Sequence, residues 1–107
     1  MSKGFSGMGN LFKQAQEMQA KLARVQEELA HRTVDGSSGG GMVHVTVTGQ
    51  LNLASIKIDP AVVNPDEREM LEDLVLAAVN EGMRLAREMA AEEMSKITGG
   101  MKIPGLT

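Results

Sequence analysis

The sequence contains no cysteine, no tryptophan and no tyrosine, and its only aromatic residues are Phe5 and Phe12. Without cysteine there is no disulfide framework and no thiolate chemistry, which fits a cytosolic protein. Proteins that bind single-stranded DNA or RNA normally stack the bases on aromatic side chains, so the composition disfavours that class. Nine methionines replace aromatic residues as apolar filler and indicate an adaptable core.

Long apolar runs are also missing. No segment approaches the roughly 20 residues that a membrane-spanning helix needs, and the first nine residues lack the apolar core of a signal peptide. We therefore expect no membrane partner and a cytoplasmic location. The 107 residues predict a single domain over residues 1–107, with flexible segments at 1–9 and 99–107.

Two alternating segments predict a β-hairpin at the centre of the chain. Their apolar residues are Val43, Val45, Val47, Ala54, Ile56 and Ile58. The alternation with polar residues is typical of half-buried strands. A two-residue turn at Gly49-Gln50 places both apolar stripes on the same face of the sheet. The pairs that this turn predicts are Val47–Asn52, Val45–Ala54 and Val43–Ile56. Residues 31–37 predict a weaker first strand, followed by a flexible glycine-rich connection.

Long helical patterns lie on both sides of this meander. The first begins after Asn10, a good capping residue, and reaches Ala30. Its apolar seam has the 3.5-residue repeat of a helix that packs lengthwise against another helix; the seam residues are Leu11, Ala15, Met18, Leu22, Val25 and Leu29. The second begins at Asn64-Pro65, where Asn caps and Pro occupies the first helical position, and runs to about Ile97, before Gly99-Gly100.

The lengths of these elements predict an α+β fold with a projecting arm. A helix of about 33 residues is roughly 50 Å long, whereas strands of about seven residues span roughly 23 Å. We expect the first half of the second helix to cover the sheet. Its second half should extend beyond the sheet and pair antiparallel with the first helix, so that the arm tip carries the start of one helix and the end of the other.

The charge distribution follows this expected geometry. Residues 1–16 and 95–107 contain four lysines and no acid, whereas the whole chain has a net charge of −3. An acidic body with a basic arm tip indicates phosphate binding without sequence readout. The alternative is that lysines near the termini only solvate the ends of the helices.

A two-fold homodimer is the expected assembly. The sheet has a second face, with Leu51 and Leu53, that nothing else in the chain covers, and its edges need protection. A dimer would present two basic tips related by symmetry, which suits the two-fold symmetry of a duplex backbone.

Short segments along nearly the whole chain match one known pattern, in order. They are residues 9–19, 39–43, 45–49, 58–60, 71–74, 77–80 and 104–105. Together they resemble the YbaB/EbfC family of nucleoid-associated proteins. The resemblance implies a tweezers-shaped homodimer whose helical arms engage duplex DNA and alter its conformation. It also implies a location in the nucleoid, a role in nucleoid organisation or gene regulation, and no catalytic motif.

The family points to the two helices for DNA contacts and not to a fixed set of side chains, so the candidates come from the charge distribution. The expected DNA-binding residues are Lys13 and Lys96, then Lys3 and Lys102, and nearer the base of the arm Lys21, Arg24, Arg84 and Arg87. Carboxylates at helical spacing, such as Glu17, Glu28 and Glu88, offer the opposing interpretation that several of these cations are simply paired.

Other chemistries find little support in the residues. His31 and His44 are the only histidines, and without cysteine they predict no metal site. We expect no enzyme activity, no cofactor and no small-molecule substrate, because no nucleophile or phosphate-loop motif is present. The alternative function is a small dimeric adaptor whose helical arm pairs with a helix of a protein partner.

Overall fold

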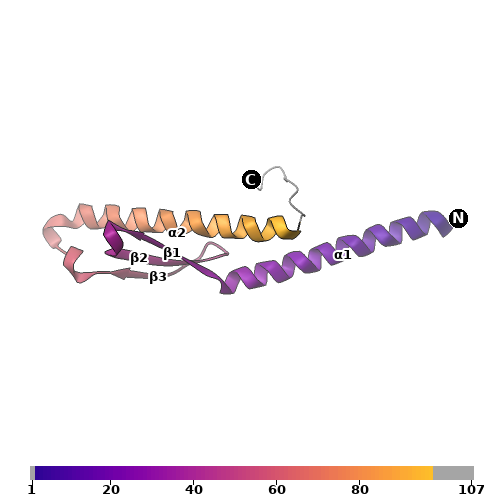
Figure 1. Cartoon of the computed structure of the whole chain (residues 1–107), viewed down its shortest axis with the longest axis horizontal. Helices are drawn as coiled ribbons and strands as arrows, with labels where there is room; N and C mark the ends of the chain where they lie inside the picture. Colours follow the sequence, from indigo (N-terminus) through magenta and orange to yellow (C-terminus); the bar gives the residue numbers. More distant parts are fainter. Residues whose placement is uncertain (1, 98–107) are drawn as a thin grey trace.

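The computed structural model describes the backbone of residues 2–97 and the side chains of residues 8–97. Its main elements are α1 (Ser2–His31), β1 (Thr33–Ser38), β2 (Val43–Thr48), β3 (Leu53–Ile58) and α2 (Arg68–Ile97). Short 3-10 turns occupy Gly39–Gly41 (η1), Pro60–Val62 (η2) and Pro65–Glu67 (η3). The predicted α+β order of helix, three-stranded antiparallel meander and long helix is confirmed (Figure 1). The molecule is elongated, with extents of 79 × 23 × 16 Å.

Helix α1 begins earlier than its sequence predicts. It starts at Ser2, so Asn10 lies inside the helix and does not cap it. Gly4, Gly7 and Gly9 each disfavour a helix by up to about 1 kcal/mol, so the sequence predicts a later start. That prediction was wrong, because the helix forms from Ser2 despite this local preference. The expected flexible segment at 99–107 lies outside the described residues.

The pairing of β2 with β3 differs from the predicted hairpin. Val43 lies opposite Ile58 and Val45 opposite Ile56, two positions further along β3 than expected. The turn is longer than two residues, because the Thr48 N–H donates to the Asn52 carbonyl at 2.8 Å.

The register also shifts between Thr46 and Val47, so that Val47 lies opposite Leu53 and not Asn52. Ala54 falls within this irregularity and has no partner on β2. A displacement of two residues preserves the faces of a strand, so Ile56 and Ile58 still share a face with the valines.

The core forms where α2 crosses β1 and β2. Val43, Val45 and Val47 are fully buried against α2. Small residues at four-residue spacing on α2, namely Ala78, Gly82 and Ala86, are buried and face the sheet. They allow a close approach: a Cβ on Gly36 of β1 would lie only 2.7 Å from the Gly82 Cα.

The start of α2 follows the prediction. Asn64 caps the first turn, because its side-chain oxygen accepts from the Asp66 N–H at 3.0 Å. Pro65 follows as the first residue of the 3-10 turn that leads into α2. Among residues 2–97, neither helix is long and apolar enough to cross a membrane.

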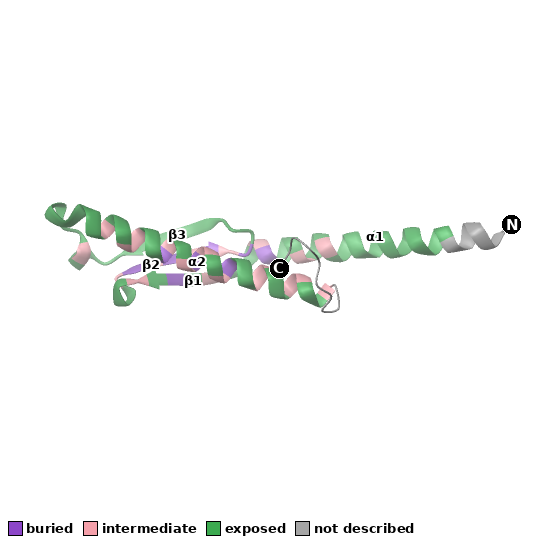
Figure 2. Ribbon diagram, turned by 90° about the horizontal axis from the view of Figure 1, so that it is seen from above, coloured by how far each residue is buried: buried purple, intermediate pink, exposed green. Residues whose placement is uncertain are grey.

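The predicted antiparallel pairing along the arm is wrong within one chain. Helix α1 does project beyond the sheet, but α2 extends past the sheet at both of its ends and does not accompany α1 to its tip (Figure 1). Every residue from 8 to 21 of α1 is exposed (Figure 2). The reason is the position of the small residues, which place the sheet under the middle of α2 and leave little helix to overlap α1.

We predict that Gly36→Ala destabilises the fold more than Gly82→Ala. The new Cβ at position 36 would meet the backbone of α2, whereas at position 82 it would meet the Cγ2 methyl groups of Val47 and Val45 at 2.8 and 2.9 Å. We expect a loss of about 2 kcal/mol for Gly36→Ala. For Gly82→Ala we expect less than about 1 kcal/mol, because alanine favours the helix.

Urea unfolding at a fixed protein concentration measures both changes. Gly9→Ala is the matched control, because nothing lies within 4 Å of a Cβ at that position on α1. A larger loss for Gly82→Ala than for Gly36→Ala would contradict the proposed crossing point.

Candidate nucleic-acid interface

The projecting part of α1 carries three exposed cations on one side. Lys13, Lys21 and Arg24 lie within an arc of about 80° around the helix axis, at about 100° per residue. Glu17 lies within the same arc, so this strip has two more positive than negative charges from Lys13 to Arg24. None of the three cations has an ion pair within the described side chains. We call Lys13, Lys21 and Arg24 the basic strip of α1.

The cations of α2 are held by carboxylates of the same helix. Arg84 donates to Glu81 at 2.8 Å and to Glu88 at 3.0 Å. The hydrogen bond to Glu81 is the main reason why the pKa of Arg84 is raised above its ordinary value. The expectation that Glu88 pairs with a neighbouring cation is therefore confirmed. Arg87 is exposed and has no ion pair among residues 8–97.

Lys96 lies at the base of α1 and not at its tip. Its ammonium is 3.0 Å from Glu93, and Glu93 also binds Arg32, the residue that follows α1. Lys13 lies 18 residues before His31, which is about 27 Å along the helix. The prediction that Lys13 and Lys96 share one tip is thus wrong for a single chain. The side chain of Lys3 and all of Lys102 lie outside the described part of the structure.

The Glu93 cluster was not found from the sequence. The hydrogen bonds from Lys96 and then Arg32 are the main reasons why the pKa of Glu93 is lowered. The Glu93 side chain is only 15% exposed, so its charge is held close to the junction between α1, β1 and α2. No local pattern signals a pair of residues 61 positions apart.

The base of α1 is fixed to the turn between β2 and β3. Leu29 is 1% exposed, and a Cβ on Gly49 would lie within 2.8 Å of it. The Gly49 N–H donates to the carbonyls of Leu29 and Arg32, at 2.9 Å each. Gln50 Nε2 donates to the Gln26 carbonyl at 2.9 Å. These contacts set the direction in which α1, and with it the basic strip, leaves the body.

The histidines form no metal site with the groups described. His44 lies on β2, and its Nε2 is 3.7 Å from Asp35 Oδ1 on the neighbouring strand β1. His44 is therefore a cross-strand neighbour of Asp35 on the sheet. In the described part of the chain, no group of three or more His, Cys, Asp or Glu residues could hold a metal ion.

The fold thus combines one long helix across a small sheet with a second helix that projects from it and carries the basic strip. Comparison with known proteins identifies the family. Residues 3–101 match the YbaB/EbfC DNA-binding family. The chain belongs to this family, which confirms the resemblance seen in its sequence segments.

Its relatives agree with this assignment. A nucleoid-associated protein of Syntrophobacter fumaroxidans is 54% identical over 99% of this chain and 93% of its own length. One of Caldanaerobacter subterraneus is 56% identical over 96% of both chains. The crystal structure of an uncharacterized protein of Helicobacter pylori has a TM-score of 0.75 at 22% identity, covering 83% of this chain and 94% of that one. That structure shows the shared fold.

We predict that Glu93→Gln removes an acid-sensitive part of the stability. Because the folded pKa of Glu93 is lowered, its charge stabilises the fold above the ordinary pKa of a glutamate. That contribution is lost as the pH falls through the lowered value. The difference in unfolding free energy between wild type and Glu93→Gln should therefore be largest near neutral pH and shrink as the pH falls through the lowered pKa of Glu93.

Urea titrations at several pH values measure this difference. Glu92→Gln is the control, since Glu92 is exposed and makes no ion pair among the described side chains. A gap between wild type and Glu93→Gln that is independent of pH would contradict an electrostatic role for Glu93.

Proposed function

We propose that this protein binds duplex DNA as a homodimer, with little sequence specificity, and alters the conformation of the DNA. Its place is the nucleoid, where it acts in nucleoid organisation or gene regulation. The relatives are named nucleoid-associated proteins, and the family is described as DNA-binding. The observation that supports the site is the basic strip, whose three cations project from α1 without carboxylate partners among the described side chains.

The basic strip is long enough to contact more than one phosphate of a duplex. Lys13 and Arg24 are separated by about 16 Å along the helix, which is several times the spacing of charges along a duplex. Lysine and arginine contacts to phosphates fix position and orientation but carry no sequence information. Binding through this strip alone would therefore be largely independent of sequence.

Because two cations of α2 are paired with carboxylates, our order of the candidate DNA-binding residues differs from the order that the sequence suggests. Arg84 must give up two carboxylate contacts before it can contact a phosphate, and Lys96 shares Glu93 with Arg32. Lys13, Lys21 and Arg24 are therefore our first candidates. Arg87 is the best candidate on α2, and Lys3 and Lys102 remain candidates by their sequence positions.

A homodimer is supported by apolar surface that one chain leaves uncovered. On α1 the seam residue Leu11 is 67% exposed and Met18 is 41% exposed. On β3, Ile56 and Ile58 are 43% and 38% exposed. A second chain that covers such surface would also bring a second α1, and two arms on one duplex could bend it.

The same exposed seam favours the adaptor as a second candidate. An unpaired apolar stripe at heptad spacing is suited to a helix of another protein. The adaptor predicts no shift of duplex DNA at any salt concentration and co-purification with one protein. DNA binding predicts an affinity that falls steeply as salt rises.

We predict that replacing Lys13, Lys21 and Arg24 by glutamine weakens binding to a short duplex. If all three side chains of both protomers contact phosphates, the slope of log K against log salt should fall in magnitude by about 5. Fluorescence anisotropy between roughly 50 and 200 mM salt measures this slope. The result should be the same for duplexes of unrelated sequence.

Arg84→Gln is the control for this experiment. Because Arg84 is already paired with Glu81 and Glu88, its loss should change the slope by less than about 1. An unchanged slope in the triple variant, or a larger change in Arg84→Gln, would contradict DNA binding through α1.

A further inference from the structure

The base of α1 is held from the side of α2 as well as from the hairpin turn. Arg32 directly follows α1, and its Nη1 donates to Glu93 Oε1 at 2.5 Å. Lys96 Nζ donates to the same oxygen at 3.0 Å. The first donor comes from the segment between α1 and β1, and the second from the last turn of α2. We call Arg32, Glu93 and Lys96 the Glu93 cluster.

The carboxylate is the most enclosed member of this cluster. The Glu93 side chain is 15% exposed, against 50% for Arg32 and 64% for Lys96. Lys96 lies three residues from Glu93 on the same helix, so it orients the carboxylate without any help from α1. Glu93 is therefore a preset acceptor on α2, and Arg32 is the residue that joins the base of α1 to it.

The position of Glu93 is set by the core of the protein. It lies 11 residues after Gly82, which is about 16 Å along α2 from the close approach to the sheet. At this end α2 lies beside the base of α1 (Figure 1). The hydrogen bonds of Gly49 and Gln50 hold the same base from the turn between β2 and β3. Two attachments on different elements restrict the direction of a helix more than one attachment does.

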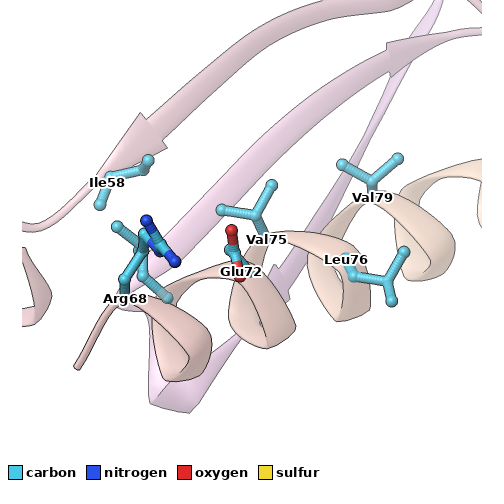
Figure 3. A pocket seen from close by; sticks show the side chains of 7 residues that line it. Ile58, Arg68, Glu72, Val75, Leu76 and Val79 are labelled. Carbon is cyan, nitrogen blue, oxygen red and sulfur yellow. The ribbon is translucent and has the colours of Figure 1, made fainter.

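Other carboxylates of α2 do not make this connection. Glu72 lines an apolar pocket between β3 and the first half of α2 (Figure 3), about 31 Å from Glu93 along the helix. Glu81 and Glu88 bind Arg84 of their own helix. Among the ion pairs of residues 8–97, Glu93 is thus the carboxylate of α2 that bonds to the residue following α1.

We infer that Glu93 is a positioning residue, which fixes through Arg32 the direction of α1 and therefore of the basic strip. Its importance for DNA binding rests on the proposed function. A binding surface on a helix that already points in the productive direction loses less conformational freedom on binding, and so binds more tightly. Neither Glu93 nor Arg32 needs to contact a phosphate for this effect.

Spin-label distances test the direction of α1 directly. The sequence has no cysteine, so Gln16→Cys on α1 and Asn80→Cys on α2 give two unique labelling sites, both exposed. A large excess of unlabelled chain limits the measured distances to those within one protomer. Because Gln16 lies about 24 Å from Arg32 along the chain of α1, Glu93→Gln should broaden the distance distribution by several ångströms.

Glu92→Gln is the matched control, because it removes the same charge from the neighbouring, exposed position. Its distance distribution should equal that of the wild type. Arg32→Gln breaks the same contact without a change in α2 and should broaden the distribution as Glu93→Gln does, whereas Arg32→Lys keeps a cation and should not. Wild-type distributions in both Glu93→Gln and Arg32→Gln, or equal broadening in Glu92→Gln, would overturn the inference.

DNA affinity separates positioning from simple electrostatics. Loss of a carboxylate alone should strengthen binding to a duplex, and by a similar factor in Glu92→Gln and Glu93→Gln. Positioning predicts instead that Glu93→Gln binds at least about three-fold more weakly than Glu92→Gln, measured by fluorescence anisotropy at one salt concentration. Equal affinities would contradict a role of Glu93 in DNA binding. A wild type without salt-dependent binding would contradict the proposed function, and the label distances would still decide whether Glu93 sets the direction of α1.

Discussion

The close approach between α2 and the sheet determines the arrangement of the other elements. Two glycines, Gly36 on β1 and Gly82 on α2, meet backbone to backbone, and alanines one turn to each side of Gly82 are also buried. A larger side chain at this crossing would lift the helix away from the valines beneath it. The crossing therefore fixes the position of α2 along its axis as well as its distance from the sheet.

Two features of the surface follow from that crossing. Because the sheet lies under the middle of α2, the surplus helix is divided between both ends and α1 is left to project alone. Because α2 lies over β1 and β2, the third strand keeps an apolar face without a covering element from the described chain. Both the projecting arm and the uncovered face of β3 are thus consequences of where small residues occur in α2.

Much of this fold could be predicted from the sequence, because local periodicity reports which face of an element is apolar. The three strands, their order, the shared face of Val43, Val45, Ile56 and Ile58, and the cap at Asn64 all follow from such patterns. The family could be recognised for the same reason, since its segments occur in order along the chain.

What could not be predicted depends on contacts between distant residues. The turn after Thr48 and the irregularity near Ala54 moved the register by two positions, and alternation alone cannot distinguish registers that differ by two. The position of Lys96 depends on Glu93 and Arg32, which the sequence separates by 61 residues. The four-residue spacing of Arg84 and Glu88 indicated that these two residues pair. Spacing along the sequence could not show that Lys13 and Lys96 lie apart.

The attachment of α1 has a mechanical consequence. Leu29, Gly49 and the Gln26–Gln50 hydrogen bond hold only the last turns of a helix that is about 45 Å long. Because the helix is attached at the hairpin turn, a tilt of about 10° there displaces its far end by about 8 Å. Small changes of packing around Gly49 would therefore widen or narrow the span that the arm can reach.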